Sequence, residues 1–370
     1  MRVLVVGAGI LGLATAWALV RSGHRAVVVE RGRAPDPRAS SVDRHRVIRV
    51  TYGPEHGYAA MALEAFAAWE RLFADLGAHR LVETGQLLLG PPEEPWIAAS
   101  LASLARLGLP FEALDADALA RRFPHVRLPE GEAAWFVPKA GALLADRICA
   151  DLVARLRDRG VEILENTEVV AVEPDRARVG TADGRSLSGD ALLIAAGVWT
   201  ARLFPAWAER LRPSRQTVVY VRPPAVLAPA WENGPVLLHK QGHRGFIFYA
   251  LPAVGGAPPK FGDHKFTLGG DPDGERTPSA DEIEPVLALA RGVLDRAPEY
   301  EILEARTCYY TVTEDERFFA EQLGATLVVS ACSGHGFKFG ALLGEHTARA
   351  LTGALPFARY RSWIEGRETG

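Results

Sequence analysis

The chain has 370 residues, of which 48% are hydrophobic and 24% are charged, and its formal net charge is −3. These values are typical of a globular protein with room for two domains, and they give no basis for binding nucleic acid or an anionic membrane. No apolar stretch reaches the roughly 20 residues that span a bilayer. Because a strand-like run begins at Arg2, we also expect no signal peptide.

The cysteines do not indicate a metal site. Cys149, Cys308 and Cys332 have neither the spacing of a zinc site nor the pairing of a disulfide framework. A sparse, odd set of thiols is typical of a reducing compartment. We therefore expect no metal and a cytoplasmic location.

The first predicted strand, at 3–6, is followed by a glycine-rich turn. The sequence Gly7-Ala-Gly9-Ile-Leu-Gly12 leads into a helix-like stretch, and a second apolar strand ends at Glu30. This is the context of the dinucleotide fingerprint. Gly7 would permit the tight turn, Gly9 would let the backbone approach a pyrophosphate, Gly12 would allow close packing, and Glu30 would bind a ribose hydroxyl. The alternative is an ordinary glycine-rich turn between a strand and a helix.

The remaining elements follow from hydrophobic periodicity. Helices are predicted at 58–75, 97–107, 142–157, 281–296 and 341–351. Strands are predicted at 86–89, 161–173, 190–196, 217–221, 245–249, 265–268 and 326–330. The strand at 190–196 runs into a small-residue turn that resembles the second FAD-contacting segment of two-domain flavoproteins. The fingerprint alone serves NAD and FAD equally, so this second segment favours FAD.

These elements predict an α/β protein with an α+β second domain. A Rossmann-type FAD-binding domain would be discontinuous, and a mixed-sheet substrate domain would be inserted into it. The FAD-binding domain would comprise 1–80, 145–212 and 318–370, and the substrate-binding domain 81–144 and 213–317.

Five segments, in chain order, resemble the monomeric sarcosine oxidase and N-methyl amino acid oxidase group of the D-amino acid oxidase-like FAD-dependent oxidoreductases. They are Arg46-Val-Ile-Arg49 with Tyr52-Gly53, Pro213-Ser-Arg-Gln216, Lys260-Phe-Gly-Asp-His264, Cys308-Tyr-Tyr310-Thr with Asp315-Glu316, and Ser333-Gly-His-Gly-Phe-Lys338-Phe. The resemblance covers nearly the whole chain, and the last two segments are its most specific parts.

The resemblance implies FAD bound covalently, through a thioether from Cys308 to the flavin 8α-methyl carbon. The alternative for Cys308 is a small buried apolar residue. The implied cofactor-binding residues are Gly7, Gly9, Ile10, Leu11, Gly12, Glu30, Arg31, Ser40, Ser41, Val169, Ala196, Gly197, Trp199, Cys308, Gly334, Gly336, Phe337 and Lys338.

For the substrate, the resemblance implies that Arg49 and Lys338 bind a carboxylate and that Tyr249 and Tyr310 line the pocket. A guanidinium fork and a mobile ammonium suit a carboxylate. The alternatives are a phosphate or structural salt-bridge role for Arg49, a surface position for Lys338, and core positions for the tyrosines.

The implied catalytic residues are Lys260, His264 and Arg46. Lys260 matches a lysine that speeds reaction with oxygen, Arg46 an arginine that stabilises the reduced, anionic flavin, and His264 a histidine near the substrate amine. The alternatives are an exposed loop lysine and a structural histidine. The family's His-Gly-Asp-Thr segment is replaced here by Val42-Asp-Arg-His45, which leaves oxygen reactivity and substrate preference open.

The expected activity is oxidation of a small secondary or cyclic amino acid to an imine, with O2 reduced to hydrogen peroxide. We expect a monomer or small homo-oligomer. The alternatives are an FAD-dependent amine dehydrogenase with another electron acceptor, a tailoring oxidase for a larger amine, and a flavin-binding subunit without turnover. An NAD-dependent dehydrogenase is disfavoured by the segments around Cys308 and 333–339.

Overall fold

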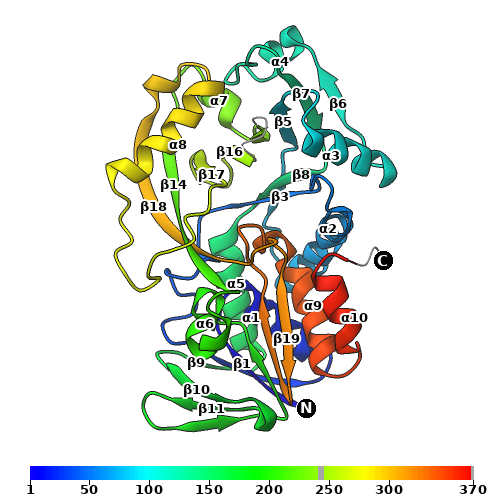
Figure 1. Ribbon diagram of the computed structural model, residues 1–370, viewed down its shortest axis with the longest axis vertical. Coiled ribbons are helices and arrows are strands. Elements are labelled where there is room, and N and C mark those ends of the chain that lie inside the picture. The colour runs from blue at the N-terminus through cyan, green and yellow to red at the C-terminus, as the bar shows by residue number, and fades with distance from the viewer. Residues whose placement is uncertain (241–245, 368–370) are drawn as a thin grey trace.

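The computed structural model describes residues 1–240 and 246–367 and has the predicted mixed α/β fold (Figure 1). One sheet, here called the parallel sheet, contains β1 (Arg2–Val6), β2 (Arg25–Val29), β9 (Glu162–Leu164), β13 (Ala191–Ile194), β19 (Phe319–Leu323) and β20 (Thr326–Ser330). Its strand order is β19-β20-β13-β1-β2-β9. β19 is antiparallel to β20, and the other pairs are parallel.

Both faces of the parallel sheet are covered, which explains why its strands are apolar along their whole length. Val3 and Val5 share a core with one layer of helices, whereas Leu4 and Val6 pack toward a small three-stranded sheet. The helices are α1 (Ile10–Arg21), α2 (His56–Leu76), α5 (Ala145–Asp158), α9 (Gly340–Leu351) and α10 (Phe357–Ile364). The small sheet contains β10 (Val169–Glu173), β11 (Arg178–Thr181) and β12 (Ser186–Ser188).

The upper part of Figure 1 is built on an eight-stranded sheet. In spatial order its strands are β18 (Glu301–Val312), β14 (Arg212–Arg222), β17 (Lys260–Asp263), β16 (Phe246–Leu251), β15 (Val236–Lys240), β5 (Gln86–Gly90), β7 (Ala133–Val137) and β6 (Glu112–Leu114). Its outer face packs against α4 (Ala116–Arg122), α7 (Ala228–Trp231) and α8 (Ala280–Val293). Because side chains alternate along a strand, the opposite face is available for a site.

The remaining elements are short. A second small sheet, β3 (Arg46–Arg49), β8 (Ala140–Leu143) and β4 (Leu81–Glu83), lies between the two large sheets in Figure 1. The other helices are α3 (Pro95–Arg106), α6 (Thr200–Leu203) and the 3₁₀ turns η1 (Pro174–Arg176), η2 (Gly197–Trp199), η3 (Pro205–Trp207), η5 (Ala297–Glu299) and η6 (Phe337–Phe339). The division into two discontinuous domains stays a prediction.

Most predicted elements are confirmed, but the strand at 265–268 is wrong. The strand in this region is β17, which ends at Asp263. The backbone N–H groups of Thr267 and Leu268 donate instead to the Ser214 hydroxyl, and Leu268 has φ of 50°. These residues therefore form a turn that is hydrogen-bonded to a side chain, and they do not pair with a neighbouring strand.

Two other predictions need correction in their boundaries, and a third lies partly outside the described residues. The helix predicted at 142–157 begins at Ala145, because the two residues before Leu144 belong to β8. The stretch 161–173 forms two strands, β9 and β10, in different sheets. Of the strand predicted at 245–249, Gly245 lies outside the described residues.

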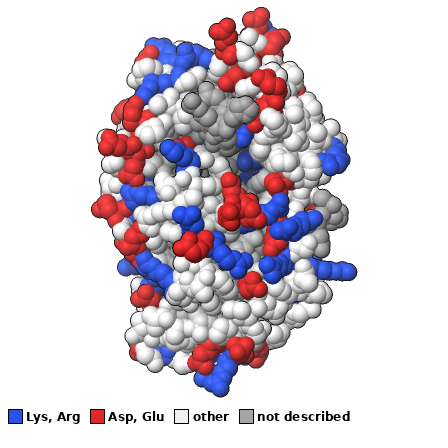
Figure 2. Space-filling model, viewed as in Figure 1, with Lys and Arg blue, Asp and Glu red and all other residues white. Residues whose placement is uncertain are grey.

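No helix among the described residues is long and apolar enough to cross a membrane. Figure 2 shows basic and acidic side chains interspersed over the face turned to the viewer, so that face carries no broad patch of one sign.

Candidate active site

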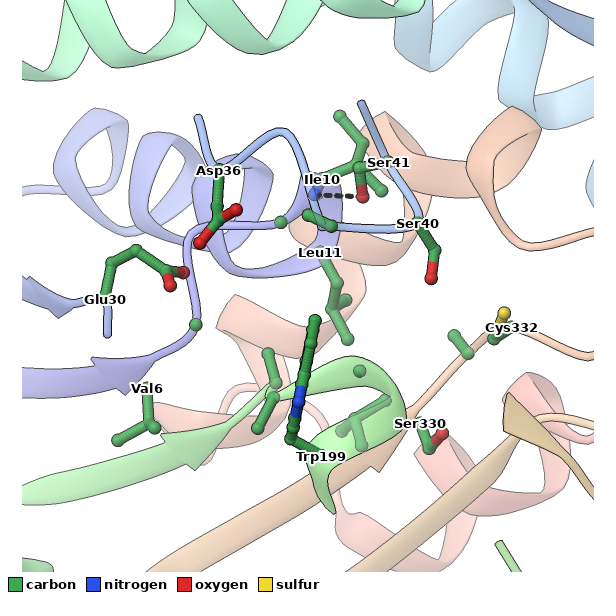
Figure 3. Close-up of a pocket in the computed structure, with 18 of the residues that line it drawn as sticks. Val6, Ile10, Leu11, Glu30, Asp36, Ser40, Ser41, Trp199, Ser330 and Cys332 are labelled. Atoms are coloured by element: carbon green, nitrogen blue, oxygen red, sulfur yellow. Dashed lines mark hydrogen bonds between the residues drawn. The ribbon is translucent and has the colours of Figure 1, made fainter. Parts of the chain in front are cut away.

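A long pocket lies at the carboxyl ends of the parallel strands, where open α/β sheets bind ligands (Figure 3). Its walls come from the turns after β1, β2, β13 and β20. Glu30 and Asp36 lie toward one end of the view, and Ser40 and Cys332 lie toward the other. The ring of Trp199 points into the space below Leu11.

The fingerprint glycines adopt the geometry that the sequence requires. Gly7 has φ of +106°, which L side chains rarely adopt, and a Cβ there would lie 2.3 Å from the Ala195 carbonyl oxygen. A Cβ on Gly12 would lie 2.0 Å from the Gly7 oxygen, so helix and turn touch at this point. Gly9 is the N-cap of α1 and has no side chain to fill the pocket.

Glu30, which follows β2, is held in place by hydrogen bonds from the backbone. Glu30 accepts hydrogen bonds from Ala8 N at 2.8 Å and from Gly32 N at 3.1 Å. Each carboxylate oxygen can accept more than one hydrogen bond, so Glu30 can still receive ribose hydroxyls. Ser41 Oγ accepts from Ile10 N at 2.9 Å and thereby ties the 40–41 segment to the start of α1 (Figure 3). This cradle of glycines, helix N-terminus and ribose acceptor fits FAD.

Most of the predicted cofactor residues line this pocket, and three do not. Those that line it are Gly7, Gly9, Ile10, Leu11, Glu30, Arg31, Ser40, Ser41, Val169, Ala196, Gly197, Trp199, Gly334, Gly336 and Phe337, together with Arg46 and Tyr310. Gly12 lies behind the turn, Lys338 follows the lining residue Phe337, and Cys308 lies beside Arg46. The sequence analysis missed the lining residues Val6, Val29, Asp36, Ala39, Thr167, Glu168, Ala195, Arg202, Leu203, Val329, Ser330, Ala331 and Cys332.

Replacing Gly12 with alanine is expected to weaken FAD binding by roughly tenfold to a hundredfold, because the new methyl group forces the turn to shift at a cost of about 1–3 kcal/mol. The measurement is the ratio of flavin to protein absorbance after purification and dialysis, made in the Cys308→Ser background so that no covalent link retains the flavin. Gly292→Ala is the matched control, since a Cβ at Gly292 meets nothing within 4 Å. Normal flavin content in Gly12→Ala would contradict this role of the glycine.

The second group of predicted residues lies on the inner face of the eight-stranded sheet. Tyr310 and Cys308 are two residues apart on β18, so they project from the same face. Tyr249 projects from the face opposite to its neighbour Phe248, which belongs to the outer core. A hydrogen bond with Tyr310 links Tyr249 to the FAD pocket, although burial raises the pKa of Tyr249 overall.

Lys260 is held in a buried ionic network that the sequence analysis did not foresee. Its Nζ donates to Asp43 Oδ2 at 2.8 Å and to the backbone oxygen of His45. Asp43 also accepts a hydrogen bond from the Tyr220 hydroxyl, and Arg46 lies 3.2 Å from its carboxylate. Lys260 is 1% exposed, so the loop-lysine alternative is wrong.

Burial and charge act in opposite directions on this network. Burial lowers the pKa of Lys260 to about 8, and the carboxylate of Asp43 opposes the shift. Burial alone raises the pKa of Asp43, but the charges of Lys260 and Arg46 outweigh it and hold that pKa below its usual range. Asp43 is therefore the anion that compensates the cations beneath the sheet.

Arg49 and Lys338 both lie close to the ring of Tyr52. The Arg49 guanidinium carbon lies 4.7 Å from the centre of the Tyr52 ring, and Lys338 Nζ lies 5.5 Å from it. Lys338 is 2% exposed, so it is not the surface lysine of the alternative, and its Nζ donates to the His335 backbone oxygen. Burial, and then the charge of Arg49, lower the pKa of Lys338. Lys338 is buried and Arg49 is partly buried, and two such neighbouring cations favour the binding of an anion.

His264 lies at the edge of this region. Its Nε2 is 3.2 Å from Glu316 Oε2, and its ring packs edge-on against Phe266. A Cβ on Gly334 would lie 3.0 Å from the Tyr310 ring and 3.5 Å from His264, so these three residues meet. The structure therefore brings His264 close to a pocket-lining tyrosine.

Cys308 and Cys332 lie together. Both belong to a cluster with Tyr310, and Cys332 itself lines the pocket. Arg46 Nη2 donates to Cys308 Sγ at 3.6 Å. Among the described residues no group of three or more His, Cys, Asp or Glu side chains could hold a metal.

The parallel sheet, the glycine turn and the pocket at the strand ends define a dinucleotide-binding protein of the Rossmann class. Residues 2–350 match the DAO family, described as FAD dependent oxidoreductase. The chain therefore belongs to the DAO family of FAD-dependent oxidoreductases, and the predicted resemblance is confirmed.

Individual relatives agree with this assignment. The chain is 30% identical over 355 residues to peroxisomal sarcosine oxidase of Mus musculus, with 92% of this chain and 90% of that protein covered. It is 28% identical over 362 residues to monomeric sarcosine oxidase of Bacillus sp. (strain B-0618), with 95% and 92% covered. The solved structure of NikD, an unusual amino acid oxidase essential for nikkomycin biosynthesis, matches with a TM-score of 0.82 and 22% identity over 97% of this chain and 96% of that one, which shows the fold.

Proposed function

We propose that the protein oxidises a small secondary or cyclic amino acid to an imine and passes the electrons to O2, forming hydrogen peroxide. The observation that carries this proposal is the position of the cations Arg49 and Lys338. Lys338 directly follows Phe337, which lines the FAD pocket, so a carboxylate bound by the two cations would sit beside the cofactor. The similarity to sarcosine oxidases supports the same substrate class.

When bound, FAD would supply a two-electron acceptor for a hydride equivalent from the carbon next to the amine. The protein residues supply position and charge. Arg49 and Lys338 bind the carboxylate, and Tyr249 and Tyr310 form the wall beside it. Nearby cations and burial lower the pKa of a bound amine, which must be neutral to react. His264 is positioned to accept or share the amine proton.

Two observations bear on the electron acceptor. Arg46 lines the pocket and supplies positive charge where a reduced flavin would carry negative charge. Lys260, in contrast, donates to Asp43, so its charge is compensated within the protein. This pairing favours a second candidate, an FAD-dependent dehydrogenase that uses another acceptor.

The activity test is peroxide formation in air with a panel of N-methyl and cyclic amino acids, alongside reduction of an artificial dye without oxygen. Peroxide formed in proportion to substrate would support the oxidase. Dye reduction without peroxide would support the dehydrogenase. Neither signal with any panel member would contradict amine oxidation.

We also propose that Cys308 carries the flavin, and we expect Cys308→Ser to abolish covalent attachment. The measurement is acid precipitation, which leaves covalent flavin in the protein pellet and releases noncovalent flavin into the supernatant. Cys332→Ser is the matched control, because Cys332 is the neighbouring thiol and lines the pocket. Flavin that stays in the pellet of Cys308→Ser, or leaves it in Cys332→Ser, would contradict the assignment to Cys308.

A further inference from the structure

A further cation, Lys240, lies near Arg49, one of the two residues that we assign to the substrate carboxylate. Its Nζ is 5.6 Å from the centre of the Trp96 ring, and the Arg49 guanidinium carbon is 5.8 Å from the same ring. Trp96 is the second residue of α3 and packs against Gly53, where a Cβ would lie 2.2 Å from the indole. One indole therefore contacts both cations.

Strand geometry shows that Lys240 points toward the inner face of the eight-stranded sheet. It is the last residue of β15, two positions after Leu238, which packs with Tyr249 and Trp96. Its neighbour His239 projects to the other side and bonds to Glu132 at 2.9 Å. Lys240 lies over the Trp96 ring, and Tyr249 packs in the same cluster as Trp96, so Lys240 and Tyr249 share a face.

Lys240 is 8% exposed, and among residues 1–240 and 246–367 no carboxylate lies within ion-pair distance of its Nζ. Burial lowers the pKa of Lys240, Glu94 and Glu316 oppose that shift through space, and Arg49 adds to it. Neither acid lies within ion-pair distance of Nζ. A buried ammonium without an ion-paired carboxylate is costly, so this arrangement favours an added anion beside Lys240.

We propose that Lys240 binds a second carboxylate on the substrate, so that the protein selects a dicarboxylic secondary amino acid over a monocarboxylic one. This inference rests on the proposed function, in which Arg49 and Lys338 bind the first carboxylate. A neutral substrate side chain would leave the Lys240 ammonium without an ion pair, whereas a carboxylate on that side chain would form one beside Trp96. Lys240 is thus a binding residue that determines specificity.

The test compares the binding of glutarate and butyrate to the oxidised holoprotein, followed through the flavin absorbance spectrum. We expect glutarate to bind roughly tenfold to a hundredfold more tightly than butyrate, as one charge-assisted hydrogen bond allows. Lys240→Met and Lys240→Gln should bring this ratio close to one, and Lys240→Arg should retain most of it. Lys139→Met is the control and should keep the wild-type ratio, because Lys139 pairs with Glu83 away from the site.

The outcomes separate this inference from the proposed function. Equal affinities in the wild-type protein, or an unchanged ratio in Lys240→Met or Lys240→Gln, would overturn the role of Lys240 while leaving a monocarboxylate site intact. Failure of both ligands to bind, together with no peroxide and no dye reduction, would overturn the proposed function as well. If Lys240→Met does not fold, the wild-type ratio and Lys240→Arg still decide the inference.

Discussion

Replacing Arg49 with leucine is expected to lower kcat/KM for a secondary amino acid by roughly a hundredfold to a thousandfold. A desolvated guanidinium that binds a carboxylate through two hydrogen bonds contributes about 3–4 kcal/mol, and each 1.4 kcal/mol is a factor of ten. Because the interaction holds the substrate rather than the reacting atoms, most of the loss should appear in KM. The measurement is steady-state kinetics together with the dissociation constant of butyrate.

Two further variants make the Arg49 result specific. Arg49→Lys keeps the charge but loses the planar fork, so it should lie between wild type and Arg49→Leu. Arg122→Leu is the control. The Arg122 guanidinium carbon also lies over an aromatic ring, 4.1 Å from the centre of Phe136, but Arg122 belongs to α4 on the outer face of the eight-stranded sheet. A change of less than about threefold in kcat/KM for Arg49→Leu would contradict carboxylate binding by this residue.

Replacing Asp43 with asparagine is expected to lower the free energy of unfolding by about 3–5 kcal/mol, because Lys260 and Arg46 would retain buried charges without their anion. Urea denaturation measures the effect. Asp43→Asn combined with Lys260→Met should recover part of the loss, which a double-mutant cycle quantifies. The control is Asp151→Asn, because Asp151 forms an ion pair with Arg80 in which each side chain is 28% exposed. This variant should lose less than about 1 kcal/mol of unfolding free energy.

The same network determines how the stability of the protein changes at acid pH. The pKa of Asp43 in the folded protein lies below its unfolded value of about 4, so the ionised group stabilises the fold above that pH. This contribution is lost as pH falls below about 4, toward the pKa of the folded state. Stability of the wild-type protein should therefore fall more steeply there than that of Asp43→Asn. Parallel curves, or an Asp43→Asn protein as stable as wild type at neutral pH, would contradict the network.

The sequence predicts the nucleotide half of the molecule well because its signals are local. The turn around Gly7 and Gly12 requires glycine for backbone reasons that act within a few residues, and the apolar strands reflect burial on both faces. The pocket-lining segment 334–337 also follows directly from the motif that contains it.

Other parts of the site depend on residues far apart in the sequence. Asp43 and Lys260 are 217 positions apart, and only the fold brings them together. Trp96 and Lys240 belong to no motif that would single them out, and their proximity to Arg49 arises where α3, β3 and β15 meet. The departure from the family pattern at 42–45 is visible in the sequence, but the pairing of Asp43 with Lys260 and Arg46 is not.

The most direct test of the account is an anaerobic titration of the holoprotein with an N-methyl amino acid and with its methyl ester. The ester replaces the carboxylate that Arg49 and Lys338 are proposed to bind with a neutral group. We predict that the free acid bleaches the flavin absorbance and that the ester does so only at a far higher concentration. Equal bleaching by both compounds, or bleaching by neither across the panel, would contradict the proposed oxidation of a carboxylate-bearing amine.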